Sequence, residues 1–228
     1  MTFMKNNRIS LVRRRMMLSV ALACGTAPIA ALAGSFDDFF KAIQLDDASA
    51  VKSLLQRGFD PNTIENVRGD TGLIMALRDN SVKVVEVLLN APKINYEIRS
   101  RNGDTALMIA AYKGNKNVVK AMLEKGAEAN QTGWTALHYA AAVGDNDIVK
   151  ILLEHSAYLD AESPNKTTPM MMAARAGKIM TVKLLLDEGA DATLKNDQGL
   201  TAIDLARRHD HADIADGLTY QLKKAGKL

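Results

Sequence analysis

The sequence predicts an all-α protein, a solenoid of about six helix-turn-helix units. Three observations lead there: the composition, a pattern that recurs on five threonines, and apolar residues at helical spacing between those threonines. Of the 228 residues, 47% are apolar and only 5% aromatic, and the apolar residues are mostly Ala, Leu, Val and Met. Such side chains favour helices that pack closely against one another.

The recurring pattern is clearest when the chain is aligned on threonines that lie 34, 30, 33 and 33 residues apart, namely Thr71, Thr105, Thr135, Thr168 and Thr201. An apolar residue follows each threonine two positions later, and an alanine follows five positions later. A pair of large apolar residues stands seventeen and eighteen positions after the first four threonines. A fixed period of this length is typical of proteins whose units stack in a row.

Within each unit, the threonine is expected to start a first helix, a Gly turn to follow, and a second helix to carry the apolar pair on its buried face. Ser81, Asn115 and Asp145 fall where second helices begin, and we expect their side chains to accept hydrogen bonds from unpaired backbone N–H groups. The alanines let neighbouring first helices approach. Burial of one apolar pair at each junction is worth roughly 3 to 6 kcal/mol.

Three segments resemble the ankyrin repeat: Thr-Ala-Leu-His-Tyr-Ala-Ala at 135–141, Thr-Pro-Met-Met-Met-Ala-Ala at 168–174 and Gly-Ala-Asp-Ala-Thr at 189–193. The resemblance covers about residues 36 to 218. It implies stacked helix pairs with β-turn fingers, and a structural role for His138 in a hydrogen bond that braces the loop. It also implies that partners bind on the concave side, which finger tips and first helices form together.

The predicted domain organisation has a leader, two capping repeats and a central array. The segments are a cleavable signal peptide (1–33), an N-terminal capping repeat (34–67), four ankyrin repeats (68–195), a C-terminal capping repeat (196–220) and a basic tail (221–228). In the first capping repeat Asp37 stands at the threonine position, with Phe39, Ala42 and Leu54 at the expected apolar offsets. Terminal repeats need a more polar outer surface than internal ones.

The leader has the three parts of a secretory signal: a basic stretch to Arg15, an apolar stretch from Met16, and a small-residue site that ends at Ala33. We expect cleavage after Ala33 and a periplasmic or secreted location. Three alternatives stay open: an uncleaved membrane anchor, a twin-arginine signal at Arg13 and Arg14, and lipoprotein processing at Cys24. Cys24 is the only cysteine, and a cysteine-free mature chain suits an oxidising compartment.

The charge balance gives no sign of a nucleic-acid partner. The formal net charge of +3 includes five bases of the leader, which has no acid; without residues 1–33 the chain has 24 bases and 26 acids, a net charge of −2. A nearly neutral body with dispersed charge lacks the basic footprint that nucleic acids require. We expect a monomer that binds a protein, with no membrane span after signal cleavage.

The sequence also lacks the signatures of catalysis and cofactor binding. It has no Gly-rich phosphate loop, cysteine pair or nucleophile elbow, so we expect no catalytic residue, no cofactor and no metal. The alternative from the enzyme class is a metal or hydrolase site near His209, His211 and Asp213. Residues two apart on a helix point in different directions, which argues against that site. The methionines fall at core offsets, which favours packing over copper binding.

Partner-binding residues are expected on the concave side, at the position before each threonine and at those seven and eight after it. The candidates are Arg78, Tyr112, Lys113, Trp134, Arg175 and Arg208. Trp, Tyr and Arg are the side chains most often found as interface hot spots. The finger from Asn130 to Thr135 is three residues shorter than its counterpart from Asp160 to Thr168. The alternative is that Trp134 packs on this shortened finger and the arginines are solvated.

The predicted function is therefore that of a non-catalytic protein-protein interaction module that binds a periplasmic or secreted protein. Two other functions stay open. One is a scaffold or protective chaperone for a secreted enzyme, and the other is an exported effector directed at a host.

Overall fold

The structure is a computed structural model, and it describes residues 29–227. Residues 1–28, which hold most of the predicted signal peptide together with Cys24 and the twin arginines, lie outside the described residues. The chain divides into two compact units, Met1–Phe36 and Asp37–Leu228, and the repeat array lies in the second. Helix α1 begins at Ile29, before the bond between Ala33 and Gly34 at which cleavage is expected.

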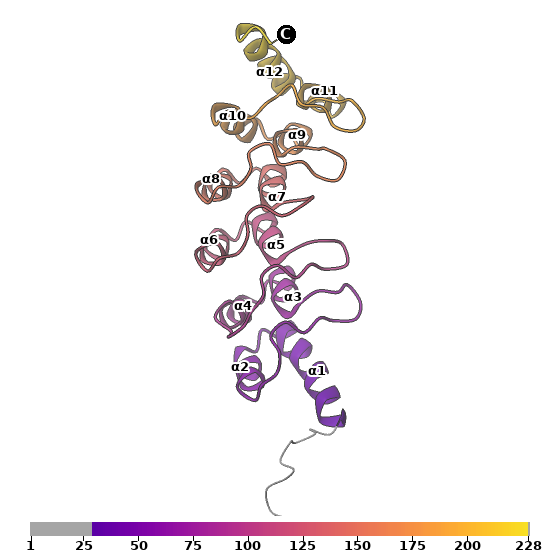
Figure 1. Ribbon diagram of the computed structural model, residues 1–228, viewed down its shortest axis with the longest axis vertical. Helices are drawn as coiled ribbons and strands as arrows, with labels where there is room; N and C mark the ends of the chain where they lie inside the picture. Colours follow the sequence, from indigo (N-terminus) through magenta and orange to yellow (C-terminus); the bar gives the residue numbers. More distant parts are fainter. Residues whose placement is uncertain (1–28, 228) are drawn as a thin grey trace, which may run out of the picture. The chain divides into compact units, whose positions relative to one another are not determined.

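The part of the chain that the structure describes contains twelve α-helices, which confirms the predicted all-α solenoid (Figure 1). Their bounds are α1 Ile29–Gln44, α2 Ala48–Gln56, α3 Gly72–Asp79, α4 Val82–Leu89, α5 Ala106–Tyr112, α6 Lys116–Glu124, α7 Ala136–Val143, α8 Asn146–Glu154, α9 Pro169–Arg175, α10 Ile179–Asp187, α11 Ala202–Arg208 and α12 Ala212–Lys224. Helix α12 continues past residue 220, so the basic segment begins as helix and buries Leu222.

Two rows of helices run through the compact unit Asp37–Leu228. The first helices α3, α5, α7, α9 and α11 contact one another in sequence (Figure 1). The second helices α4, α6, α8, α10 and α12 each pack on their own first helix, and α2 contacts α4. The alanine five positions after each threonine is fully buried in all five units: Ala76, Ala110, Ala140, Ala173 and Ala206. Since alanine has the smallest side chain that still favours a helix, the first helices can lie against each other at these points.

The second helices supply the larger apolar side chains. Leu88, Met122, Leu152 and Leu185 occupy equivalent positions, seventeen residues after their threonines, and all are fully buried. The first capping repeat follows the same frame, because Phe39 and Leu54 are also buried. The core is therefore a continuous layer between the two rows.

The threonines start the first helices as expected. The hydroxyl oxygens of Thr71, Thr105, Thr168 and Thr201 accept hydrogen bonds from the N–H groups three residues later. Thr135 differs, because its hydroxyl faces the Nδ1 atom of His138 at 2.9 Å.

The second helices α4, α6 and α8 begin after Ser81, Asn115 and Asp145 as predicted, but the expected side-chain capping bonds are only partly present. Asp145 Oδ1 accepts from the N–H of Ile148 at 3.1 Å, as expected, but neither Ser81 nor Asn115 makes a side-chain capping bond. Ser81 is buried at the junction with α1, where its hydroxyl donates to the carbonyl of Ile43 at 2.7 Å. Asp46 of the preceding unit accepts from the N–H of Val84 at 3.0 Å and so caps α4. The cap is thus supplied across the repeat junction.

Side-chain amides and carboxylates at the bases of the fingers join each unit to the next. The Asn62 amide donates to the carbonyl of Lys93 at 2.9 Å, and its oxygen accepts from the N–H of Asn95 at 2.8 Å. Asn130 makes the same pair of bonds to Ser156 and Tyr158, at 2.7 Å each. These polar bonds fix the register of consecutive units, a task that the apolar core cannot perform because hydrophobic contact is not directional.

The turns between paired helices place glycine where two constraints meet. Gly177 has φ of +69°, and a Cβ built on it would lie 2.5 Å from the Cε1 atom of His211. His211 starts α12, so its ring covers the turn of the preceding unit. Any larger residue at position 177 would strain the backbone and require the His211 ring to move.

Candidate partner-binding face

The predicted residues belong to one surface, the finger-side face, which we define as the finger segments together with the first helices α3, α5, α7, α9 and α11. One contact sets its geometry: the Arg78 guanidinium donates from Nη2 to Asp104 Oδ2 at 2.7 Å. Arg78 stands seven positions after Thr71, and Asp104 immediately precedes Thr105. The end of one first helix therefore lies beside the finger of the next unit.

Arg78 is held in a buried charge network. Asp70 is fully buried, and its Oδ2 atom lies 3.1 Å from Arg78 Nε and 3.3 Å from Arg68 Nε. Among the described residues, the two carboxylate oxygens of Asp70 and the Nε atom of Arg78 have no hydrogen-bond partner. Their contacts are therefore ion pairs without directed hydrogen bonds. Burial raises the pKa of Asp70, while the two guanidinium groups act in the opposite direction. The Arg78 side chain is only 24% exposed, and its contacts are with its own fold.

The same network reaches the next two units. Asp104 accepts a short hydrogen bond from the Tyr139 hydroxyl, and Lys113 Nζ donates to the Arg78 carbonyl at 2.8 Å. Burial raises the pKa of Tyr139, and the bond to the Asp104 carboxylate raises it further. Tyr139 therefore stays a neutral donor, and it ties α7 to the finger before α5.

Tyr112 stands above this network and remains accessible. Its ring meets that of Tyr139 edge to face, with centroids 6.1 Å apart and planes at 89°. The Tyr112 residue is 54% exposed, which is high for a large aromatic residue at the centre of a repeat array. The pair gives the finger-side face a fixed aromatic ring that solvent reaches.

Trp134 is half-buried on the shortened finger. Its ring lies edge to face against His138, with centroids 5.2 Å apart. Arg99 supports the finger from one side, donating to Gln131 Oε1 at 2.7 Å and to the Thr132 carbonyl at 3.0 Å. Part of the indole is thus packed within its own unit, as the alternative interpretation expected, and part is exposed on the face.

His138 braces the loop as the resemblance implied. Its Nε2 atom lies 2.8 Å from the Thr167 carbonyl, which can only accept, so Nε2 carries the proton and Nδ1 accepts from the Thr135 N–H and hydroxyl. The side chain is fully buried, and this desolvation lowers its pKa to about 4. His138 is therefore a neutral structural residue that joins the fourth unit to the fifth.

Arg175 and Arg208 occupy the same repeat position as Arg78 but lie in different surroundings. Both are exposed, and within residues 29–227 neither guanidinium takes part in a hydrogen bond or ion pair. For Arg175, the positions equivalent to Asp70 and Asp104 hold Thr167 and Leu200, neither of which carries a charge, and Arg208 belongs to the last unit of the array. One repeat position thus carries a structural arginine in one unit and a solvated one in another.

The comparisons with known proteins agree with this geometry. A family profile described as ankyrin repeats (three copies) matches residues 39–132, 92–163 and 157–225. The chain belongs to the ankyrin-repeat family. It resembles a crystal structure of EF0377, an ankyrin repeat protein, with a TM-score of 0.69 and 25% identity, over 80% of this chain and 96% of the other.

Two human proteins are among its ankyrin-repeat relatives. Transient receptor potential cation channel subfamily A member 1 is 29% identical over 160 residues, which is 65% of this chain and 14% of that protein. SH3 and multiple ankyrin repeat domains protein 2 is 31% identical over 176 residues, which is 75% of this chain and 10% of that protein. The chain therefore spans only a small part of the length of these relatives, and what it shares with them is the repeat array.

His209 and His211, the histidines of the alternative metal site, lie at the α11–α12 turn next to Arg208. His209 ends α11 and is exposed, whereas the ring of His211 covers Gly177. Among residues 29–227 no three His, Cys, Asp or Glu side chains converge as a metal ion would require. In the same range, no helix combines the length and apolar character needed to cross a bilayer.

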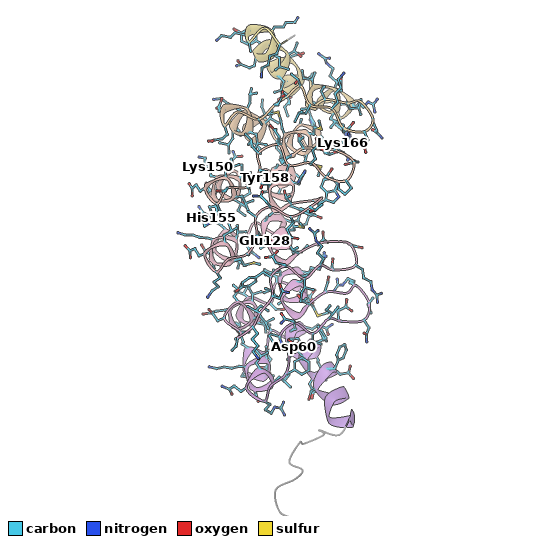
Figure 2. The ribbon with its side chains drawn as sticks, viewed as in Figure 1. Asp60, Glu128, Lys150, His155, Tyr158 and Lys166 are labelled. Carbon is cyan, nitrogen blue, oxygen red and sulfur yellow. The ribbon has the colours of Figure 1, made fainter. Side chains whose placement is uncertain are left out.

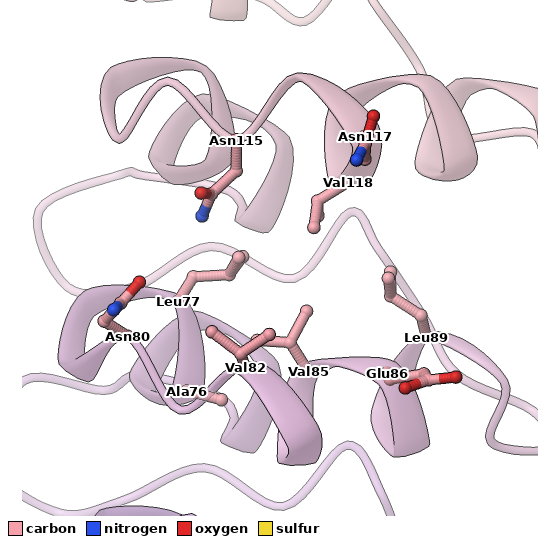
Figure 3. A pocket seen from close by; sticks show the side chains of 10 residues that line it. All are labelled: Ala76, Leu77, Asn80, Val82, Val85, Glu86, Leu89, Asn115, Asn117 and Val118. Atoms are coloured by element: carbon pink, nitrogen blue, oxygen red, sulfur yellow. The ribbon is translucent and has the colours of Figure 1, made fainter.

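A cavity of about 230 Å³ lies between the second and third units of the array (Figure 3). Val82 and Val85 of α4 face Val118 of α6 across it. None of the six predicted partner-binding residues lines this cavity. The finger-side face is therefore a separate feature.

Sequence reasoning missed the buried network beneath the predicted patch. Asp70 and Asp104 stand at the position before a threonine, where only partner contacts were expected, and Tyr139 was not among the predicted residues. A signal was present in the sequence: an acid before a threonine together with a base seven positions after it, in the same unit, as in Asp70 and Arg78. That combination indicates an internal ion pair rather than two free contact residues.

Replacing Arg78 by Met is expected to lower the free energy of unfolding by about 3 kcal/mol, because it leaves the Asp70 carboxylate buried without its nearest counter-charge. Arg175→Met is the matched control, since it stands at the same repeat position in an exposed site, and it should change stability by less than about 0.5 kcal/mol. Urea unfolding followed by circular dichroism measures both. Adding Asp70→Asn to Arg78→Met should recover part of the loss; strictly additive effects would contradict the network.

The protonation of His138 predicts a defined pH dependence. Its pKa is about 4 in the folded chain and about 6.5 when unfolded, so the folded state resists the proton that the unfolded state accepts. The contribution of neutral His138 to the free energy of unfolding is complete above pH ~6.5. It is lost as the pH falls towards ~4, and the loss is on the order of 3 kcal/mol. Urea unfolding of the wild type and His138→Gln across this range should show the wild type losing more stability than the variant. His155→Gln, at an exposed site, should behave as the wild type does; parallel curves for all three would refute this role.

Proposed function

We propose that this chain is a non-catalytic binding module that holds a periplasmic or secreted protein on its finger-side face. Ankyrin repeats are general protein-protein interaction modules, and their fold is typically non-catalytic. The observation that carries the proposal is the exposed Tyr112 ring, which packs edge to face on Tyr139, on a face that also carries the half-buried Trp134. A rigid aromatic side chain loses little conformational entropy on binding, which makes it a favourable contact.

The compartment is part of the proposal. The basic stretch to Arg15, the apolar stretch after it and the small residues up to Ala33 support export and cleavage. The absence of cysteine after Cys24 is compatible with an oxidising compartment.

Site-specific photo-crosslinking tests the binding face. A benzophenone amino acid at position 112 should capture a discrete exported protein, because Tyr112 is exposed at the centre of the proposed face. The matched control carries the same group in place of Lys150, which lies on α8 in the row of second helices, away from the finger that carries Lys166 (Figure 2). Products are resolved on gels and identified by mass spectrometry. Capture from position 150 but not from 112 would overturn the proposed face.

A further inference from the structure

The three central units of the finger-side face carry an unbalanced charge. The turn of each finger and the first helix after it are residues 100–114, 130–144 and 163–177, and the finger that begins at Asp160 also carries the exposed Glu162 just before the last of these segments. These segments contain four bases, Arg101, Lys113, Lys166 and Arg175, and all four are exposed. The single acid is Asp104, which is 8% exposed and is bound by Arg78 and Tyr139. The accessible charge of this region is therefore positive.

The basic region is bounded at both ends. The equivalent segment of the preceding unit, residues 66–80, carries the exposed Arg68 and Asp79, and that of the last unit, residues 196–210, carries two exposed bases, Arg207 and Arg208, and two exposed acids, Asp197 and Asp210. The exposed charges of each end segment therefore cancel. A long polyanion that followed the whole array would meet these acids. The pattern therefore suits a ligand whose length matches three units.

The middle of this region has no charge at all. Segment 130–144 contains neither an acid nor a base, and its first helix presents the half-buried Ala142 and Val143. Tyr112 and Trp134 border these small residues, because the position seven after one threonine lies beside the finger of the next unit. The central strip, which we define as Arg101, Tyr112, Lys113, Trp134, Ala142, Lys166 and Arg175, thus has basic ends and an apolar centre.

The spacing of the units gives the length of a matching ligand. Packed helices lie about 8 to 10 Å apart, so the first helices of the outer two units are separated by roughly 20 Å. An extended chain advances about 3.3 Å per residue and covers this distance in about six to eight residues. Such a segment places its two ends over the two basic pairs.

We propose that the central strip binds an extended segment of a protein partner, with carboxylates at both ends and apolar side chains between them. This proposal rests on the proposed function and specifies the partner's chemistry. Carboxylates would pair with Arg101 and Lys113 at one end and with Lys166 and Arg175 at the other, while Tyr112, Trp134 and Ala142 receive the apolar residues. A nucleic acid would present phosphates throughout and would leave the uncharged centre unused.

Fluorescence anisotropy with a labelled peptide tests the proposal. The probe has three glutamates on either side of two leucines, and the comparison peptide has glutamine in place of every glutamate. The full-length protein should bind the first peptide and not the second, and its affinity should fall with ionic strength. Equal binding of the two peptides would overturn the proposal.

Charge reversal locates the site. Lys113→Glu combined with Arg175→Glu should weaken peptide binding at least about ten-fold, since two attractive contacts become repulsive. Lys150→Glu combined with Lys183→Glu changes the net charge equally on the exposed surface of α8 and α10, and it should leave the affinity unchanged. Thermal unfolding by circular dichroism verifies that both variants fold. Equal weakening by the two double variants would refute the central strip as the site.

Two further outcomes separate this proposal from the proposed function. A protein captured from position 112, together with a peptide affinity that charge reversal leaves unchanged, would overturn the acidic segment while the binding module stands. A labelled single-stranded oligonucleotide of eight nucleotides that binds as tightly as the acidic peptide would overturn the choice of a protein ligand.

Discussion

The close approach of neighbouring first helices is the constraint on which the rest of the protein depends. It is possible because an alanine lies at each contact, from Ala76 in the second unit to Ala206 in the last, and each is fully buried. No unit could bury its apolar face alone, so stability is shared along the array. The fingers are held in register by this approach, and the finger-side face exists only because consecutive fingers and helix ends lie side by side.

Polar contacts across the junctions convert this stack into a defined surface. His138 links its own threonine to the Thr167 carbonyl of the next unit, and Asn130 binds the backbone of the next finger base. Buried polar groups with satisfied partners specify one arrangement, whereas apolar contact tolerates several. The exposed side chains of the face are therefore presented from a rigid base, which lowers the entropic cost of binding.

Features that depend on residues within one repeat could be predicted from the sequence. The threonine caps, the buried alanines and the large apolar residues of the second helices follow from offsets within one unit, and each was predicted in place. Contacts between units were harder to predict. Ser81 binds the Ile43 carbonyl 38 residues away, and Asp46 caps α4 in its stead, because both depend on how two units meet in space.

The candidate site was predictable in position but not in role. All six predicted residues lie on or beside one face, yet Arg78 faces Asp70 and Asp104, while Arg175 at the equivalent position is exposed. The difference lies in the residues before two threonines: Asp70 and Asp104 stand on either side of Arg78, whereas Thr167 and Leu200 occupy the equivalent positions for Arg175. The same repeat position can therefore stabilise the fold in one unit and remain available for a partner in the next.

The free energy of unfolding of two neighbouring alanine variants tests the central constraint most directly. Ala140 lies fully buried between the first helices, whereas Ala142, two residues later on the same helix, is half-buried on the finger-side face. Ala140→Leu should lower the free energy of unfolding by about 3 kcal/mol, because the larger side chain forces α7 away from its neighbours. Ala142→Leu should change it by less than about 0.5 kcal/mol. Similar values for the two variants would contradict the account.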